Sequence, residues 1–329
     1  MSRPRLGGRC AAALWLCTAA LASQEGATIR VNVNLVRVVA TVKTKTGQTV
    51  GTLQKEDFEL YDNGVKQQVA VFEHQTEQKL SVALLVDVSG STAKELSYEA
   101  DSAYRFVHAL LGEGNPQDAL KLYTFNWRVT DETGRYTRDL KLLSGLLKTM
   151  HGEAGTAMYD AIYFAARDLE PREGRKVIVV VTDGGDTVSK RDLQAALQEA
   201  QLADAVIYAI VVVPITNEAG RNIGGEHALQ FMAEGTGGRT FMPTIGTALD
   251  KAFTDILTEL RTQYLLGFYP HDVPLTKNAF HKLEVRVQNQ DLRVSARNGY
   301  YGEFEGMNGS PEERISISPE RQQKPTKKK

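Results

Sequence analysis

Three oxygen-bearing side chains alternate within one short segment, Asp87-Val88-Ser89-Gly90-Ser91. In an extended loop this spacing can turn Asp87, Ser89 and Ser91 toward one point, and hard oxygen ligands are those that Mg²⁺ prefers. The same residues also fit a plainer interpretation, because Ser91 could cap a following helix and Asp87 could accept hydrogen bonds from loop amides. Taken alone, the segment leaves both interpretations open.

Two further segments supply oxygens at comparable places in the chain. Gly155-Thr156 precedes a stretch with helical periodicity, and Thr182-Asp183-Gly184-Gly185 follows the apolar run 177–181. Thr156 would also serve as a helix cap and Asp183 as a turn residue. Because all three segments lie where one type of element gives way to another, together they favour a divalent metal site. The predicted ligands of a Mg²⁺ ion, with Mn²⁺ and Ca²⁺ as alternatives, are Asp87, Ser89, Ser91, Thr156 and Asp183.

Alternating buried strands and helices must position these side chains. The continuous apolar run 82–86 is typical of a strand buried on both faces of a parallel sheet. Further strands are predicted at 119–125, 176–181 and 205–213, and helices at 93–111, 138–150, 157–169, 191–203, 226–234 and 248–262. This order predicts an α/β domain over residues 79–262 with a doubly wound, mostly parallel sheet, whose ligand sites lie at the carboxyl ends of the strands.

A β-rich arm flanks this domain on each side, at residues 28–76 and 263–302. In the first arm, 29–42 alternates like a strand, and the segments 58–61 and 67–72 indicate a hairpin around Asn63-Gly64. Each arm has about three strands, too few to cover a core alone. We therefore expect the two arms to form one discontinuous β-sandwich into which the α/β domain is inserted.

The two ends of the chain differ in character from the rest. Residues 1–23 have the features of a cleavable signal peptide: basic residues, then the apolar run 10–21, which closes on Ala20-Leu21-Ala22. We therefore expect export to the periplasm or the outside of the cell, with no membrane span in the mature chain. Residues 303–329 are polar and contain proline, which predicts a disordered tail.

Composition and motifs argue against several classes of protein. The chain has 39 basic and 40 acidic residues, so no overall positive field would attract nucleic acid. The sequence contains neither a P-loop nor a G-x-G-x-x-G motif after a strand, and its six histidines form no H-E-x-x-H pair. We therefore predict no nucleic-acid partner, no nucleotide cofactor and no catalytic zinc.

Two enzymatic interpretations remain as alternatives to a binding protein. Asp87 could be the nucleophile of an exported metal-dependent hydrolase or phosphatase, but such enzymes need an acid where Ser89 stands. The segment Ser91-Thr92-Ala93-Lys94 matches the S-x-x-K motif of serine β-lactamases, yet Lys45-Thr46-Gly47 precedes it, which reverses the order of motifs in those enzymes. The prediction is a protein without catalytic residues. A scaffold whose metal is only structural is a further alternative.

The order D-x-S-x-S, G-T and T-D-G resembles the von Willebrand factor type A (VWA) domain family over about residues 79–261. The resemblance implies that Ser89 and Ser91 bind the metal directly, that Thr156 does so when a ligand is present, and that Asp87 and Asp183 act largely through water. The arms, at 53–64 and 263–270, resemble exported VWFA-related proteins first described from acidobacteria.

This resemblance implies adhesion rather than catalysis. Mostly neutral hydroxyl ligands would leave the cation electrophilic and keep a water-filled position on it, which a carboxylate from another protein can take. We therefore expect Mg²⁺-dependent protein binding or adhesion through a metal-ion-dependent adhesion site. The expected partner is a protein of open identity that presents an Asp or Glu.

Overall fold

The computed structural model describes residues 35–74, 78–90, 96–212, 222–244, 246–273 and 280–302. The predicted signal peptide at 1–23, the tail at 303–329 and the candidate ligand Ser91 lie outside these residues. Within the described ranges, no helix combines the length and the apolar character needed to cross a membrane.

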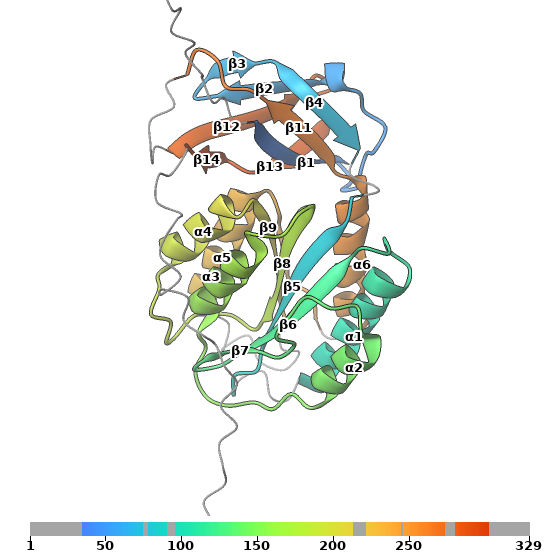
Figure 1. The fold of residues 1–329 in the computed structure, drawn as a ribbon, viewed down its shortest axis with the longest axis vertical. Helices are drawn as coiled ribbons and strands as arrows, with labels where there is room; N and C mark the ends of the chain where they lie inside the picture. The colour runs from blue at the N-terminus through green and yellow to red at the C-terminus, as the bar shows by residue number, and fades with distance from the viewer. Residues whose placement is uncertain are drawn as a thin grey trace, which may run out of the picture. The chain divides into compact units, whose positions relative to one another are not determined.

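A six-stranded sheet forms the centre of the α/β domain, in the order β10-β9-β8-β5-β6-β7 (Figure 1). Its strands are β5 (Leu80–Asp87), β6 (Ala119–Phe125), β7 (Val129–Asp131), β8 (Arg175–Thr182), β9 (Ala205–Val211) and β10 (Thr240–Phe241). All neighbours pair in parallel except β6 and β7. Every residue of β5 is buried, which accounts for its apolar run. The short edge strand β7, only partly buried, was not expected from the sequence.

Helices cover both faces of this sheet (Figure 1). One face carries α3 (Met158–Leu169), α4 (Leu193–Leu202) and α5 (Ile223–Thr236), and the other carries α1 (Leu96–Gly112), α2 (Leu140–Lys148) and α6 (Thr247–Thr262). Because side chains alternate along a strand, β5 places Leu84 and Val86 in one core and Ala83 and Leu85 in the other. The predicted doubly wound α/β fold is confirmed.

Two four-stranded antiparallel sheets form the β-sandwich, in the orders β13-β1-β11-β4 and β14-β12-β2-β3. Their strands are β1 (Val36–Thr44), β2 (Phe58–Asp62), β3 (Val65–Gln67), β4 (Val69–His74), β11 (Tyr264–Phe268), β12 (Phe280–Val287), β13 (Leu292–Ala296) and β14 (Gly299–Tyr301). The arms are interleaved, since β1 pairs with β11 and β2 pairs with β12. Val38, Leu60 and Leu266 are fully buried in their common core. The expected discontinuous sandwich is confirmed.

The predicted hairpin after Phe58 is shorter than expected. Strand β2 pairs only with the three residues of β3, whereas β4 crosses to the other sheet and pairs with β11. The change of sheet follows Gln67, whose buried amide is fixed by the backbone of His271. The Gln67 Nε2 donates to the His271 carbonyl at 3.1 Å, and the His271 amide donates back to Oε1 at 3.0 Å. Strand propensity alone does not distinguish between the two sheets.

Candidate metal centre

Two neighbouring parallel strands deliver carboxylates to the same edge of the α/β sheet. Asp87 is the last residue of β5, and Asp183 follows Thr182, the last residue of β8. The register places Val86 opposite Val181, so the two strands end at the same level. This edge is where open α/β sheets form their ligand sites.

Hydrogen bonds hold the Asp87 carboxyl group in a fully buried position. Its Oδ1 accepts from the Ser89 amide at 2.8 Å, and its Oδ2 accepts from the Thr182 hydroxyl at 2.6 Å. Thr182 Oγ1 in turn accepts from the Gly184 amide at 3.1 Å. Thr182 therefore ties Asp87 to the loop that carries Asp183.

The electrostatics of Asp87 show that the two carboxylates lie close enough to interact. Burial is the main reason that the pKa of Asp87 is raised to about 6, and the charge of Asp183 acts in the same direction. Hydrogen bonds from Thr182 and Ser89 oppose this rise in pKa. A cation at this edge would stabilise both charged carboxylates.

Hydrogen bonds from backbone amides join the loop of Thr156 to the two others. The Glu153 amide donates to the Val88 carbonyl at 2.9 Å, which places this loop beside Ser89. The Thr156 amide donates to the Thr187 hydroxyl at 2.9 Å, and the Thr187 amide donates back to the Thr156 carbonyl at 2.9 Å. The three oxygen-bearing loops thus form one hydrogen-bonded ring, which we call the edge ring: residues 87–90, 153–157 and 182–189.

Two acidic side chains that the sequence analysis did not single out shape this ring. Asp186 accepts from the Tyr159 amide at 3.0 Å and from the Ser189 hydroxyl at 2.5 Å. Asp160 accepts from the amides of Lys190 and Arg191 at 3.0 and 3.2 Å. Both carboxylates already accept hydrogen bonds from the protein. They therefore position the loop of Asp183 and are not candidate ligands. The three-residue spacing of Asp186 and Ser189 is the one local pattern that could have indicated that Asp186 is hydrogen-bonded within its own loop.

Trp127 lies at the rim of the edge ring. Gly155 has a φ of +86°, a conformation that favours glycine, and a Cβ added there would lie only 3.0 Å from the Trp127 Cβ. The Trp127 Nε1 donates to Glu153 at 2.8 Å, and the Arg128 guanidinium lies over its ring. Trp127 is 55% exposed.

Four of the five predicted ligands occupy the edge ring. Asp87, Ser89 and Thr156 are buried, with exposures of 0%, 2% and 6%, and Asp183 is partly exposed. The described part of the chain has no group of three or more His, Cys, Asp or Glu side chains that could hold a metal. The candidate ligands are instead two carboxylates together with hydroxyl groups, and these are oxygen donors that suit a hard cation.

The sequence of this domain matches a known family. A family model described as the von Willebrand factor type A domain matches residues 81–255, which is more than half of the chain. This chain belongs to the von Willebrand factor type A domain family. The resemblance noted from the motifs is thereby confirmed, and membership supports a role in protein–protein binding. The narrower resemblance to exported acidobacterial proteins stays a prediction.

Solved structures similar to this chain include other VWA domains. The vWF domain of the type V pili tip protein Mfa5 from Porphyromonas gingivalis is 14% identical with a TM-score of 0.46, and the match covers 55% of this chain and 95% of that one. A von Willebrand factor type A protein from Catenulispora acidiphila is 14% identical with a TM-score of 0.47, covering 75% of this chain and 63% of that one. A search of curated proteins finds no match to the chain.

Proposed function

We propose that this VWA protein binds a partner protein through a Mg²⁺ ion held by Asp87, Ser89, Ser91, Thr156 and Asp183. The observation that carries the proposal is the edge ring, which joins the loops of four of these residues by hydrogen bonds at the carboxyl edge of the sheet. Mn²⁺ or Ca²⁺ could take the same oxygen ligands. The role is one of binding and needs no catalytic residue.

Each ligand residue has a distinct part in this proposal. Asp87 is held by Thr182 and Ser89, so its carboxylate stays fixed as the negative charge that attracts the cation. Thr156 is fixed through its backbone, whereas its hydroxyl forms no hydrogen bond within the described residues, which leaves that oxygen available. When bound, the cation supplies an open position for a carboxylate of the partner.

Exposed apolar side chains in and beside the edge ring suit a protein partner. Trp127 and Val188 are 55% and 46% exposed, and both belong to segments that contact or bond to the loop of Thr156. Ile223, 60% exposed, follows Asn222, whose side chain lies against Gly185. An acidic residue flanked by apolar ones would match this surface, because tryptophan is enriched among the residues that contribute most to protein–protein binding.

Affinity capture tests this function. The protein without residues 1–23 is immobilised and exposed to exported proteins of its source, in Mg²⁺ or in EDTA. We expect a specific protein that is retained in Mg²⁺ and released by EDTA, that Thr156→Val fails to capture, and that Thr156→Ser still captures because serine keeps the hydroxyl. Equal capture by the valine variant, or capture unaffected by EDTA, would contradict the proposal.

Export itself rests on the predicted signal peptide, and the presence of the chain in a periplasmic or extracellular fraction checks it.

A further inference from the structure

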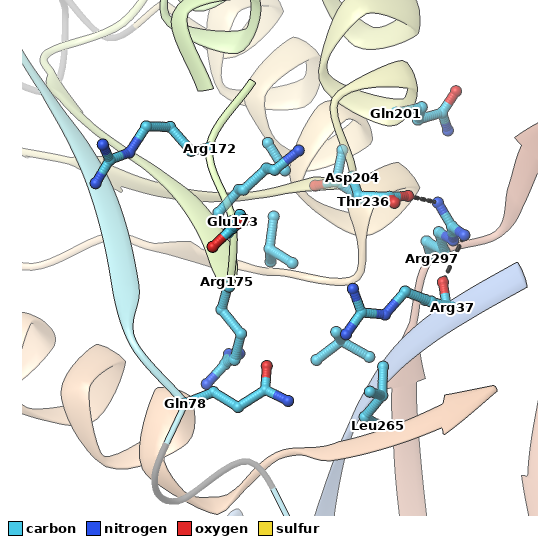
Figure 2. A pocket seen from close by; sticks show the side chains of 15 residues that line it. Arg37, Gln78, Arg172, Glu173, Arg175, Gln201, Asp204, Thr236, Leu265 and Arg297 are labelled. Atoms are coloured by element: carbon cyan, nitrogen blue, oxygen red, sulfur yellow. Dashed lines mark hydrogen bonds and ion pairs between the residues drawn. The ribbon is translucent and has the colours of Figure 1, made fainter. Parts of the chain in front are cut away.

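A pocket of about 270 Å³ lies between the β-sandwich and the α/β domain (Figure 2). Its walls come from β1 and β11 of the sandwich and from the first residues of β8 and β9. Asp87 and Thr182 lie at the other ends of their strands, and at 3.3 Å per residue the length of β8 separates the two edges by about 23 Å. The pocket is therefore distinct from the candidate metal centre.

The lining of the pocket is rich in positive charge. Five basic residues contribute to it, against two acidic ones. The basic residues are Arg37, Arg172, Arg175, Lys176 and Arg297, and the acidic ones are Glu173 and Asp204. The whole chain has a net charge of −1, so this concentration of cations is local.

Three of the five basic side chains already form hydrogen bonds with other groups of the protein. The guanidinium of Arg175 is buried and donates to the Leu260 carbonyl and to Gln263. Arg297 donates to Asp204 and to the carbonyl of Arg37. Arg172 points away from the pocket in Figure 2, and its Nε donates to Ser81 at 3.1 Å.

Arg37 and Lys176 are the cations left to act on a ligand. Figure 2 shows the Arg37 side chain reaching from β1 into the pocket, and its guanidinium forms no hydrogen bond or ion pair with the described residues. Lys176 Nζ donates to the Glu170 carbonyl at 2.7 Å and meets no carboxylate at ion-pair distance within the described chain. Burial lowers the pKa of Lys176; the charges of Asp204 and Glu170 act against this, whereas the charge of Arg37 acts with it, so Arg37 and Lys176 lie close enough to repel each other.

Apolar side chains complete the pocket. Val206 and Leu265 are 7% and 4% exposed, and Val39 lies two residues from Arg37 on the same face of β1. Small-molecule sites commonly combine such an apolar wall with a few convergent polar groups, and they often lie between domains. The volume suits a ligand of small size.

We propose that this pocket binds a small organic anion, with its acidic group between Arg37 and Lys176 and its apolar body against Val39, Val206 and Leu265. An anion there relieves the repulsion between the two cations and gains charge-assisted hydrogen bonds from both. Because the ligand touches the sandwich and the α/β domain together, its binding stabilises their contact.

A fluorescent probe tests this site in the protein without residues 1–23. Anilinonaphthalene sulfonate joins one acidic group to an apolar body, and N-phenyl-1-naphthylamine is its neutral counterpart. We expect saturable binding of the sulfonate at one site and displacement of it by hexanoate. In Arg37→Met the dissociation constant should rise about tenfold, as expected when a charge-assisted hydrogen bond is lost. The neutral probe should bind weakly and equally to both proteins.

The matched control is Arg293→Met, which removes an exposed arginine on β13 outside the pocket. It should bind the sulfonate like the wild type, and Lys176→Met should weaken binding as Arg37→Met does. The proposal is overturned if the sulfonate does not bind saturably, or if Arg37→Met and Arg293→Met bind it equally. Melting temperatures of the variants, measured without probe, establish that each is folded.

Discussion

At the scale of single residues, the candidate metal centre depends on how one buried carboxylate is held. Asp87 is fully buried, and burial disfavours its charged form. The Thr182 hydroxyl donates to it at 2.6 Å from a position 95 residues further along the chain. Thr182 therefore positions the Asp87 carboxylate, although it is not among the predicted ligands.

Replacing Thr182 by valine removes this hydroxyl and keeps the shape of the side chain. One Asp87 oxygen and the Gly184 amide then lose a partner in a buried place. We expect the free energy of unfolding, measured by urea denaturation in EDTA, to fall by about 1–3 kcal/mol. Thr182→Ser keeps the hydroxyl and should lose only about 1 kcal/mol for the buried methyl group. A valine variant as stable as the serine variant would show that this hydroxyl does not hold Asp87.

At the scale of elements, the sequence predicted the strands and loops of the site better than it predicted the hydrogen bonds between those loops or the pairing of β4. The apolar runs of β5 and β8 and the oxygens that follow them are local patterns, so Asp87 and Asp183 could be placed at one sheet edge in advance. The bonds of Asp186 and Asp160 depend on how the loop folds back on α3, which no local pattern specifies. The sheet change of β4 was missed for the same reason, since the partner of Gln67 is 204 residues away.

The loop of Thr156 depends on Gly155, and this gives a prediction with a built-in control. Gly155→Ala places a Cβ at positive φ and against Trp127, so it should lower the free energy of unfolding by about 1–2 kcal/mol. Gly145→Ala, within α2 and facing open space, should instead raise it by about 0.5–1 kcal/mol. Thermal or urea denaturation measures both. Changes of the same sign would contradict the role given to the Gly155 backbone.

At the scale of the whole described chain, a buried polar cluster joins the sandwich to the α/β domain. Gln263, 1% exposed, follows α6 directly and precedes β11. Its Nε2 donates to Thr41 of β1 at 2.7 Å and to Tyr208 of β9 at 3.1 Å, and its Oε1 accepts from Arg175 of β8. The two parts therefore share hydrogen bonds that neither could satisfy alone.

Disrupting this cluster should lower the stability of the sandwich and the α/β domain together, because we expect the two to unfold in one transition. Gln263→Leu leaves the buried Arg175 and Thr41 without these bonds, so we expect a loss of about 3 kcal/mol with a single unfolding transition. Gln194→Leu, on the exposed side of α4, should change stability by less than about 0.5 kcal/mol. Calorimetry distinguishes the outcomes. Two separate transitions, or an unchanged melting temperature in Gln263→Leu, would contradict this coupling.

The central claim is that a divalent cation binds at the edge ring, and Trp127 offers a direct readout. Outside residues 1–23 it is the single tryptophan, and it lies beside the loop of Thr156. Titration with paramagnetic Mn²⁺, followed by Trp127 fluorescence, should give saturable quenching that excess Mg²⁺ reverses. Asp87→Asn should weaken this binding at least about tenfold, whereas Glu113→Gln, at an exposed acid elsewhere, should not. Quenching that does not saturate, or that is the same in Asp87→Asn, would contradict the metal centre.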